Sequence, residues 1–163
     1  MTSPPHKRHK SAPTRLPPAP SASSAGARAV MVGNRGADTK PERALRSALH
    51  GGGLRFFKNR RPEPEIACRA DIVFPTARLA VFVDGCFWHR CPIHGVSPRA
   101  NSEYWRAKLD RNVARDLRND SALSAAGWEV VRVWEHEDLE QSARSIATLI
   151  REKRQAKPAS QKR

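Results

Sequence analysis

Residues 83–95, VDGCFWHRCPIHG, gather several potential metal ligands in one short segment. With a histidine that directly follows a later apolar segment, they form a candidate ligand set: Cys86, Cys91, His94 and His136. Two thiolates and two imidazoles make a closed tetrahedral site of the kind that holds a structural zinc ion. His89 lies between the two cysteines and is an alternative to His94 as a ligand. Free thiols and surface histidines are the other interpretation of this segment.

The same segment carries two adjacent large aromatic residues, Phe87 and Trp88. If the two cysteines bind zinc together with His94 and His136, His89 is not a ligand. The loop held by the metal then exposes Phe87, Trp88 and His89. Exposed aromatic rings beside basic residues stack on bases or wedge between them. Composition alone favours the alternative that both aromatic residues pack in the core.

Two acidic residues lie in or next to apolar runs that are typical of strands. Asp71 interrupts the run 70–74, where a carboxylate without a partner costs free energy. Asp84 ends the next apolar run, just before the loop that carries His89. Carboxylates that hold Mg²⁺ against a phosphate, with a histidine that takes a proton from water, are what metal-assisted phosphodiester hydrolysis requires. A structural pairing of Asp71 with Arg69 is the alternative.

The elements that must position these residues can be read from hydrophobic periodicity. A first helix follows Thr39, whose spacing from Glu42 is that of a capping box, and three glycines end it. The further elements that we expect are strands at 54–58, 70–74, 79–83 and 129–134, and helices at 102–126 and 138–153. Ser102 is expected to cap the long helix and Gly127 to end it. This order predicts an α/β fold with a mixed central sheet flanked by helices.

The formal net charge of +14 is concentrated at the two ends of the chain. Residues 1–30, rich in proline, serine and alanine, contain five basic residues and no acidic one, and residues 151–163 contain six basic residues and one acidic one. We therefore expect one domain, 31–150, between a disordered basic N-terminal tail and a basic C-terminal tail. Nucleic acid is the first candidate for their polyanionic partner, and solubility with non-specific binding is the alternative.

Basic residues also recur along the predicted long helix: Arg106, Lys108, Arg111, Arg115 and Arg118. They are candidates for contacts with DNA phosphates, which position a protein without reading sequence. Because acidic residues alternate with them, at Asp110, Asp116 and Asp120, a solvated charged face is an equal alternative.

Cysteine content and hydropathy indicate the cellular compartment in which the protein is expected. Three cysteines, two of them in the candidate metal site, fit a reducing compartment better than a disulfide framework. The third, Cys68, is expected to be a small packed residue. No apolar run approaches the roughly 18 residues that span a bilayer, and the N-terminus lacks a signal-peptide pattern. We expect a cytoplasmic, nucleoid-associated protein that does not bind membranes.

Five segments, read in order, resemble the very short patch repair endonuclease family: DTKPE, RADIVFP, VFVDGCFWHRCPIH, EYWRAKLDRNVARD and GWEVVRVWEHE. The resemblance covers residues 28–150, and GCFWH is its most specific motif. It implies a restriction-endonuclease-like fold. It also implies an endonuclease that nicks DNA on the 5′ side of the thymine in a T·G mismatch, the lesion left when 5-methylcytosine deaminates.

By position, the resemblance implies catalytic roles for residues of this chain. Asp71 matches the magnesium-binding aspartate, His89 the general base, and Glu42 an acid that supports the active site. Where the family has a threonine and a histidine before the Gly-Cys pair, this chain has Val83 and Asp84. We expect the backbone carbonyl of Val83 to face the magnesium ion and Asp84 to be a second carboxylate ligand.

The resemblance also implies how DNA is held. Phe87 and Trp88 match aromatic residues that wedge into the duplex beside the mismatch, and Met31 matches an apolar residue that enters from the other groove. The implied partner is double-stranded DNA with a T·G mismatch, bound by a monomer with catalytic Mg²⁺ and structural Zn²⁺; contacts with other repair proteins are left open. Two alternative functions remain. One is a related nuclease that serves restriction or defence, and the other is a DNA-binding protein that is stabilised by zinc and has no catalytic activity.

Overall fold

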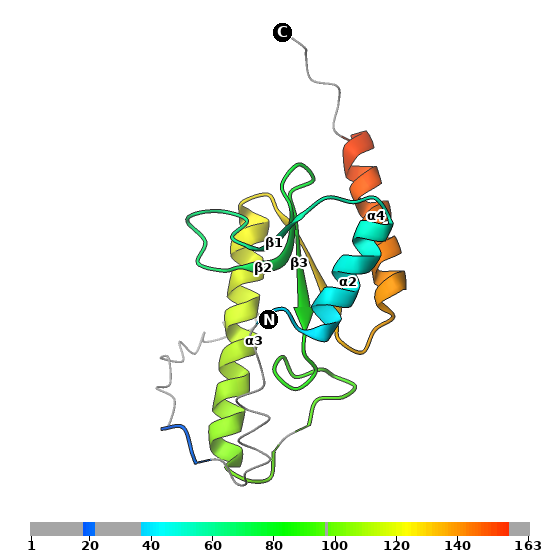
Figure 1. Cartoon of the computed structure of the whole chain (residues 1–163). Coiled ribbons are helices and arrows are strands. Elements are labelled where there is room, and N and C mark those ends of the chain that lie inside the picture. The colour runs from blue at the N-terminus through cyan, green and yellow to red at the C-terminus, as the bar shows by residue number, and fades with distance from the viewer. Residues whose placement is uncertain (1–17, 22–36, 97, 157–163) are drawn as a thin grey trace, which may run out of the picture.

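The computed structural model describes residues 18–21, 37–96 and 98–156. Its elements are α2 (Lys40–Gly51), β1 (Phe57–Arg60), β2 (Ala70–Phe74), β3 (Leu79–Asp84), α3 (Ser102–Ala125), β4 (Glu129–Trp134) and α4 (Leu139–Ala156). The strands form a central sheet, with α2 and α4 side by side on one face and α3 on the other (Figure 1). The prediction of an α/β fold with a mixed sheet flanked by helices is confirmed.

The order of strands in the sheet is β1-β2-β3-β4. The pairs β1–β2 and β2–β3 are antiparallel, and β4 is parallel to β3 because α3 carries the chain back between them. The start of β2 therefore lies beside the ends of β1, β3 and β4. We call this part of the molecule the site end of the sheet, because Asp71 and Asp84 both lie there.

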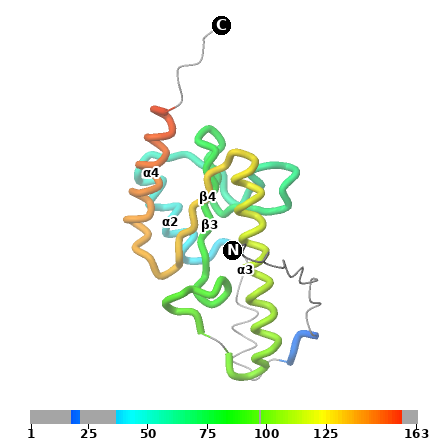
Figure 2. Tube along the Cα trace, turned by 180° about the vertical axis from the view of Figure 1, so that it is seen from behind, coloured from blue at the N-terminus to red at the C-terminus, as the bar shows by residue number. Residues whose placement is uncertain are grey.

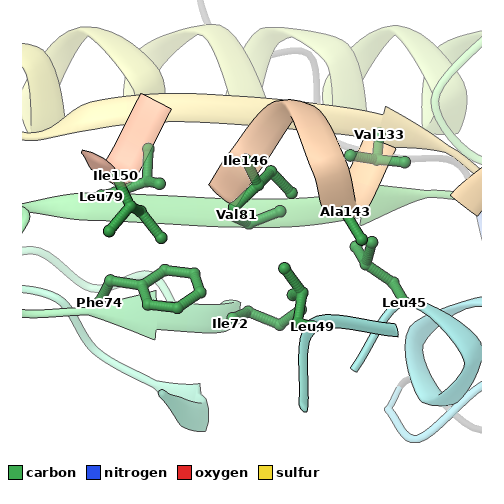
Figure 3. Packing of buried hydrophobic residues seen from close by; sticks show 10 residues of the cluster. All are labelled: Leu45, Leu49, Ile72, Phe74, Leu79, Val81, Val133, Ala143, Ile146 and Ile150. Atoms are coloured by element: carbon green, nitrogen blue, oxygen red, sulfur yellow. The ribbon is translucent and has the colours of Figure 1, made fainter. Parts of the chain in front are cut away.

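Each face of the sheet has its own core. Figure 3 shows the larger one, in which α2 and α4 pack on the sheet through ten buried residues: Leu45, Leu49, Ile72, Phe74, Leu79, Val81, Val133, Ala143, Ile146 and Ile150. The α3 face is covered by a smaller cluster, in which Leu123 and Trp128 pack against Val73, Ala80 and Phe82. Strands β2 and β3 are thus buried on both faces, which is why the sequence of each is an almost continuous apolar run.

Several ends of the elements depart from the predicted ones, most of them by one or two residues and three of them in ways that matter for the fold. β1 begins at Phe57 rather than residue 54, because Leu54 and Phe56 pack against the α2–α4 core before strand pairing starts. The predicted cap of α3 at Ser102 is wrong, since Asn101 is the N-cap residue, in a left-handed conformation and without a side-chain cap. Helix α4 continues to Ala156, so its last turn lies within the predicted tail 151–163. Strands 70–74 and 129–134 are confirmed.

Helix α3 is longer than the sheet that it covers. Its first turns extend beyond the site end and run beside the loop that follows β3, while its last turns pack on the sheet (Figures 1 and 2). Gly127 ends the turn after α3 with φ of +79°, a conformation that favours glycine. In the part of the chain that the structure describes, no helix is long and apolar enough to cross a membrane.

Candidate active site and metal centre

Asp71 is held at the site end by the neighbouring strand. Its Oδ2 atom accepts a hydrogen bond of 2.8 Å from the backbone N–H of Val83. Its Oδ1 atom has no hydrogen-bond partner among the described residues. The alternative pairing with Arg69 is not present, since Arg69 donates to the backbone carbonyl of Asn59 instead. One carboxylate oxygen of Asp71 is therefore available for a ligand.

The surroundings of Asp71 make its negative charge costly. Desolvation by burial raises its pKa from 3.8 to about 6, against the lowering effect of the hydrogen bond from Val83. The nearby carboxylates of Glu42 and Asp84 raise the pKa further, and Arg46 lowers it. A buried carboxylate among other acids is a favourable place for a divalent cation, because the cation relieves both the burial and the repulsion.

His89 projects from the loop after β3 towards α3. Its Nδ1 atom lies 2.7 Å from Oδ2 of Asp116 and 3.5 Å from Oδ1 of Asp84. Burial opposes ionisation of Asp116, yet hydrogen bonds from His89 and Arg115 lower its pKa below the ordinary value. A carboxylate on Nδ1 fixes the orientation of the imidazole and favours the tautomer whose Nε2 accepts a proton. His89 with Asp116 therefore has the arrangement of an oriented general base.

Asp116 was missed as a site residue because its sequence context is that of a charged surface helix. Two further contacts tie the loop to the same helix: Asn112 donates to the backbone carbonyl of Trp88 at 3.2 Å, and Arg90 pairs with Asp110 at 3.0 Å. Three successive loop residues, 88–90, are thus anchored on α3. The position of His89 depends on these contacts as well as on β3.

Asp84 has a partner that the sequence did not reveal. Both of its carboxylate oxygens accept hydrogen bonds of 2.8 Å from Nη1 of Arg132, on the parallel strand β4. Arg132 also binds Asp120 of α3, and its guanidinium lies 4.8 Å from the centre of the Phe82 ring. Burial works against its charge, but the hydrogen bonds that Arg132 donates to Asp120 and Asp84 raise its pKa. This geometry favours Arg132 over a magnesium ion as the partner of Asp84.

Replacing Arg132 with methionine is expected to destabilise the fold, because Asp84 is only 3% exposed and would lose its counter-charge. Since the Arg132 side chain is itself partly exposed, we expect a loss of about 2–3 kcal/mol in the free energy of unfolding. Urea denaturation measures it. The double variant Asp84→Asn/Arg132→Met should recover part of the loss, and no recovery would show that Arg132 does not act through Asp84.

Glu42 is buried at the start of α2, with 6% of its surface exposed. Thr39 caps the helix as predicted, its hydroxyl accepting from the N–H of Glu42 at 3.4 Å. The Glu42 carboxylate does not return to the N–H of Thr39, as a full capping box requires. It binds the N–H of Asp38 and the hydroxyl of Thr39, and pairs with Arg46. Its effect on Asp71 is exerted through charge.

The structure brings together the four predicted metal ligands at the outer side of the loop. One ligand atom from each of Cys86, Cys91, His94 and His136 lies within 4.8 Å of the others. Nδ1 of His136 is 3.0 Å from Sγ of Cys86 and 3.7 Å from Sγ of Cys91. A zinc ion with bonds of about 2.0–2.3 Å separates its ligand atoms by about this much, so the set fits tetrahedral zinc. His89 points away, to Asp116.

We predict that the protein contains about one zinc ion per chain, measured by elemental analysis after dialysis. Cys91→Ser should lose the zinc and lower the melting temperature, because the loop is then held only by its contacts with α3 and by the hydrogen bond from Cys86 to Glu135. Cys68→Ser is the matched control, since Cys68 is equally buried but packs in the α3-face core, outside the ligand set. Stoichiometric zinc in the Cys91 variant would contradict this site.

Phe87 and Trp88 are neither fully exposed nor part of either core. Both are half-buried, in a cluster with Trp105 of α3, whose ring centre is 5.5 Å from that of Phe87 and 6.0 Å from that of Trp88. The Tyr104 ring packs edge-on against Trp105, with 5.4 Å between the ring centres. The ammonium of Lys108 lies 5.3–5.6 Å from three of these rings. Trp105 lies one turn before the buried Leu109, but its ring belongs to this aromatic cluster.

The other predicted DNA contacts are distributed along α3. Arg106, Arg111 and Arg118 are exposed, whereas Arg115 pairs with Asp116 at 3.0 Å. With Lys108 over the aromatic rings, the basic residues of this helix have several different surroundings. Met31 lies outside the described residues.

Comparison with known proteins places this arrangement in a family. The pattern described as DNA mismatch endonuclease Vsr matches residues 23–94. The chain is 46% identical over 133 residues to the type II nicking enzyme V.NaeI of Lentzea aerocolonigenes, covering 80% of each chain. The chain belongs to the Vsr family of DNA mismatch endonucleases. It is therefore a DNA endonuclease, and the family predicted from the five segments is confirmed.

Other members of the Vsr family show similar agreement. The type II nicking enzyme V.XorIIP of Xanthomonas oryzae pv. oryzae is 46% identical over 112 residues, which is 68% of this chain and 79% of the relative. The DNA mismatch endonuclease Vsr of Escherichia coli strain K12 is 40% identical over 100 residues, 60% of this chain and 62% of the relative. The named relatives thus include nicking enzymes and a mismatch endonuclease.

Proposed function

We propose that this Vsr-family protein is a magnesium-dependent endonuclease that nicks one strand on the 5′ side of the thymine in a T·G mismatch. The observation that carries the proposal is the pairing of His89 with Asp116, 2.7 Å apart, at the same end of the sheet as the half-buried Asp71. Metal-assisted hydrolysis of a phosphodiester needs a general base and a carboxylate that can bind a metal ion. His89 and Asp71 are the candidates for these two roles. Family membership supplies DNA as the substrate.

Asp71 and the backbone carbonyl of Val83 would hold the magnesium ion. The free Oδ1 atom of Asp71 and the raised pKa of its carboxyl group support this assignment. When bound, the ion supplies a Lewis acid that stabilises the charge developing on the phosphate. Asp84 is less suited to be a ligand, because Arg132 holds both of its oxygens. Glu42 supports the site by adding negative charge beside Asp71.

His89 takes a proton from the attacking water in this proposal. Asp116 holds Nδ1 of the imidazole and stabilises the positive charge that His89 acquires. Oδ1 of Asp84, whose charge is balanced by Arg132, lies 3.5 Å from the same Nδ1 atom. These contacts orient Nε2 without help from the substrate, so the base is preorganised.

The mismatch would be recognised by the aromatic cluster. Phe87 and Trp88 lie on a loop that the zinc ligands fix on one side and α3 fixes on the other, which supports their use as a wedge between base pairs. A mismatched step costs less to open than a matched one, and that difference gives selectivity. Trp105 extends the same apolar surface, and Met31 would enter from the other groove.

The fold that supports this chemistry is proposed to be restriction-endonuclease-like, with residues 31–150 as the catalytic domain between basic tails. A related nuclease that serves restriction or defence is the second candidate, because several relatives are named type II nicking enzymes. The residues that carry hydrolysis are the same in both readings. They differ only in whether a T·G pair is required.

Two end-labelled duplexes that differ in one base pair test the proposal. One carries a T·G pair and the other a matched C·G pair, each within a panel of flanking sequences, and nicking is followed on both strands. We expect cleavage of the thymine-containing strand of the mismatched duplex only. Equal cleavage of both duplexes would favour the general nuclease, and tight binding without cleavage in every context would favour a DNA-binding protein without catalysis.

A further inference from the structure

A group of basic residues surrounds β1, the strand at one edge of the sheet. We call it the β1 patch; it consists of Arg55, Lys58, Arg60, Arg61 and Arg69, all exposed. The segment 54–61 contains no acidic residue. Within the described part of the chain, no ion pair involves any of the five. Their charges are therefore available to an external anion.

This patch is next to the proposed catalytic carboxylate. β1 is antiparallel to β2, with Arg60 opposite Ala70, so the end of β1 reaches the strand position that precedes Asp71. Arg69 lies two residues before Asp71, and its guanidinium turns back across the strand pair to the carbonyl of Asn59 at 2.9 Å. Arg61 follows directly after β1. The β1 patch thus begins at the site end of the sheet and continues along its edge.

An aromatic ring lies within the patch. Phe57 is 50% exposed, and it is one of the few large apolar residues that the described surface exposes. The Arg60 guanidinium lies 4.2 Å from the centre of its ring. Exposed aromatic and guanidinium planes among unpaired cations are typical of surfaces that bind nucleic acids.

A competing explanation is that the charges protect an open strand edge from pairing with another chain. That explanation requires charges only on the strand itself, where Lys58 and Arg60 lie. Arg55, Arg61 and Arg69 lie outside the strand, and edge protection does not account for them. Some exposed cations elsewhere have acidic partners, as in the pairs Arg78–Glu63 and Arg90–Asp110. Others, such as Arg106 and Arg111 of α3, have none among the described residues, so it is the clustering around one strand next to Asp71 that distinguishes the β1 patch.

We propose that the β1 patch binds the phosphate backbone of the DNA duplex that flanks the nicked bond. The patch contributes affinity and register without reading sequence or the mismatch. The inference rests on the endonuclease assignment but not on the T·G specificity. Because each phosphate contact releases a counterion, the patch makes the binding depend steeply on salt concentration.

The test is DNA binding by the full chain, measured by fluorescence anisotropy without magnesium over a series of NaCl concentrations. In the variant Lys58→Gln/Arg60→Gln/Arg61→Gln, we expect binding at low salt to weaken on the order of ten-fold or more. The slope of log K against log salt should fall by about 2–3, near 0.9 for each lost contact. The ratio of affinities for mismatched and matched duplexes should not change.

The matched control is Lys40→Gln/Arg43→Gln/Arg144→Gln, which removes the same charge from exposed residues of α2 and α4 outside both basic tails. Equal losses in both variants, or none in the first, would overturn the proposal. If the first variant aggregates, the variant Arg55→Gln/Arg69→Gln leaves the strand charges in place. The slope of log K against log salt should still fall, by about 1–2. An unchanged slope would mean that these residues do not contact DNA, and protection of the strand edge would be the remaining explanation of the patch. A wild-type protein that fails to prefer T·G would refute the proposed specificity without affecting this result.

Discussion

Asp71→Asn is expected to give a protein that is more stable than the wild type and inactive. Burial raises the pKa of Asp71 to about 6, so the ionised carboxylate that predominates at neutral pH costs the folded state free energy relative to the unfolded state. Asparagine keeps an oxygen that accepts the N–H of Val83 and carries no charge. We expect the free energy of unfolding to increase by about 3 kcal/mol at pH 8, measured by urea denaturation in the absence of divalent cations.

The pH dependence of this difference follows from the direction of the shift. The folded-state pKa, about 6, is higher than the ordinary value of 3.8, so the folded state binds more protons between the two. The wild type should therefore lose stability as the pH rises from about 4 to about 6 and change little above that. The Asn variant should lack this loss, and the two curves should meet near pH 4. A gap of constant size across this range would show that charge is not the cause.

The same substitution should remove the activity. The neutral amide cannot hold Mg²⁺ as the carboxylate does, and we expect nicking to fall by about 10³-fold or more in single-turnover assays. Magnesium should raise the melting temperature of the wild type but not of the variant, since only the wild type has the carboxylate. A variant that is both stable and active would exclude Asp71 from the metal site.

His89→Ala is expected to have the second largest effect. Loss of a general base slows hydrolysis by about 10²–10⁴-fold, and DNA binding should be unchanged because His89 is not part of the aromatic cluster. Asp116→Asn should cost less, about 10–100-fold, because the base remains but its orientation and charge stabilisation are weakened. The readouts are the single-turnover rate constant and, separately, the affinity for DNA.

Asp110→Asn is the matched control for Asp116. Both acids lie on α3 and pair with a residue of the same loop, but Asp110 binds the exposed Arg90 rather than His89. Near-normal rates in this control, with zinc retained in all variants, would show that the loop is intact. If Asp116→Asn also keeps a normal rate, the oriented base is not part of the mechanism.

Local signals in the sequence were sufficient for most of the scaffold. The runs ADIVF and EVVRVW are strands within the predicted bounds because burial on the sheet requires continuous apolar segments. Thr39 caps its helix because the cap is a contact between residues close in sequence. The clustering of Cys86, Cys91, His94 and His136 was also predictable, since a soft-metal site needs particular side chains and a histidine after β4 completes the candidate set.

The missed residues share a physical reason. Asp116 and Arg132 gain their roles from partners 27 and 48 positions away, and only the packing of α3 and β4 against β3 brings them together. In the sequence, Asp116 is one of several alternating charges, and Arg132 is a single cation in an apolar strand. Trp105 has the spacing of a core residue, yet the start of α3 extends beyond the sheet and leaves it beside Phe87.

The most direct test of the central claim is to map the nick on a duplex with one T·G pair, with magnesium and with chelator. We predict a single break, on the 5′ side of the mismatched thymine, that appears only with magnesium. The opposite strand should remain intact. A break that forms equally in chelator, or that falls at other positions or on both strands, would contradict the account in which Asp71 and His89 form a magnesium-dependent site directed by the aromatic wedge.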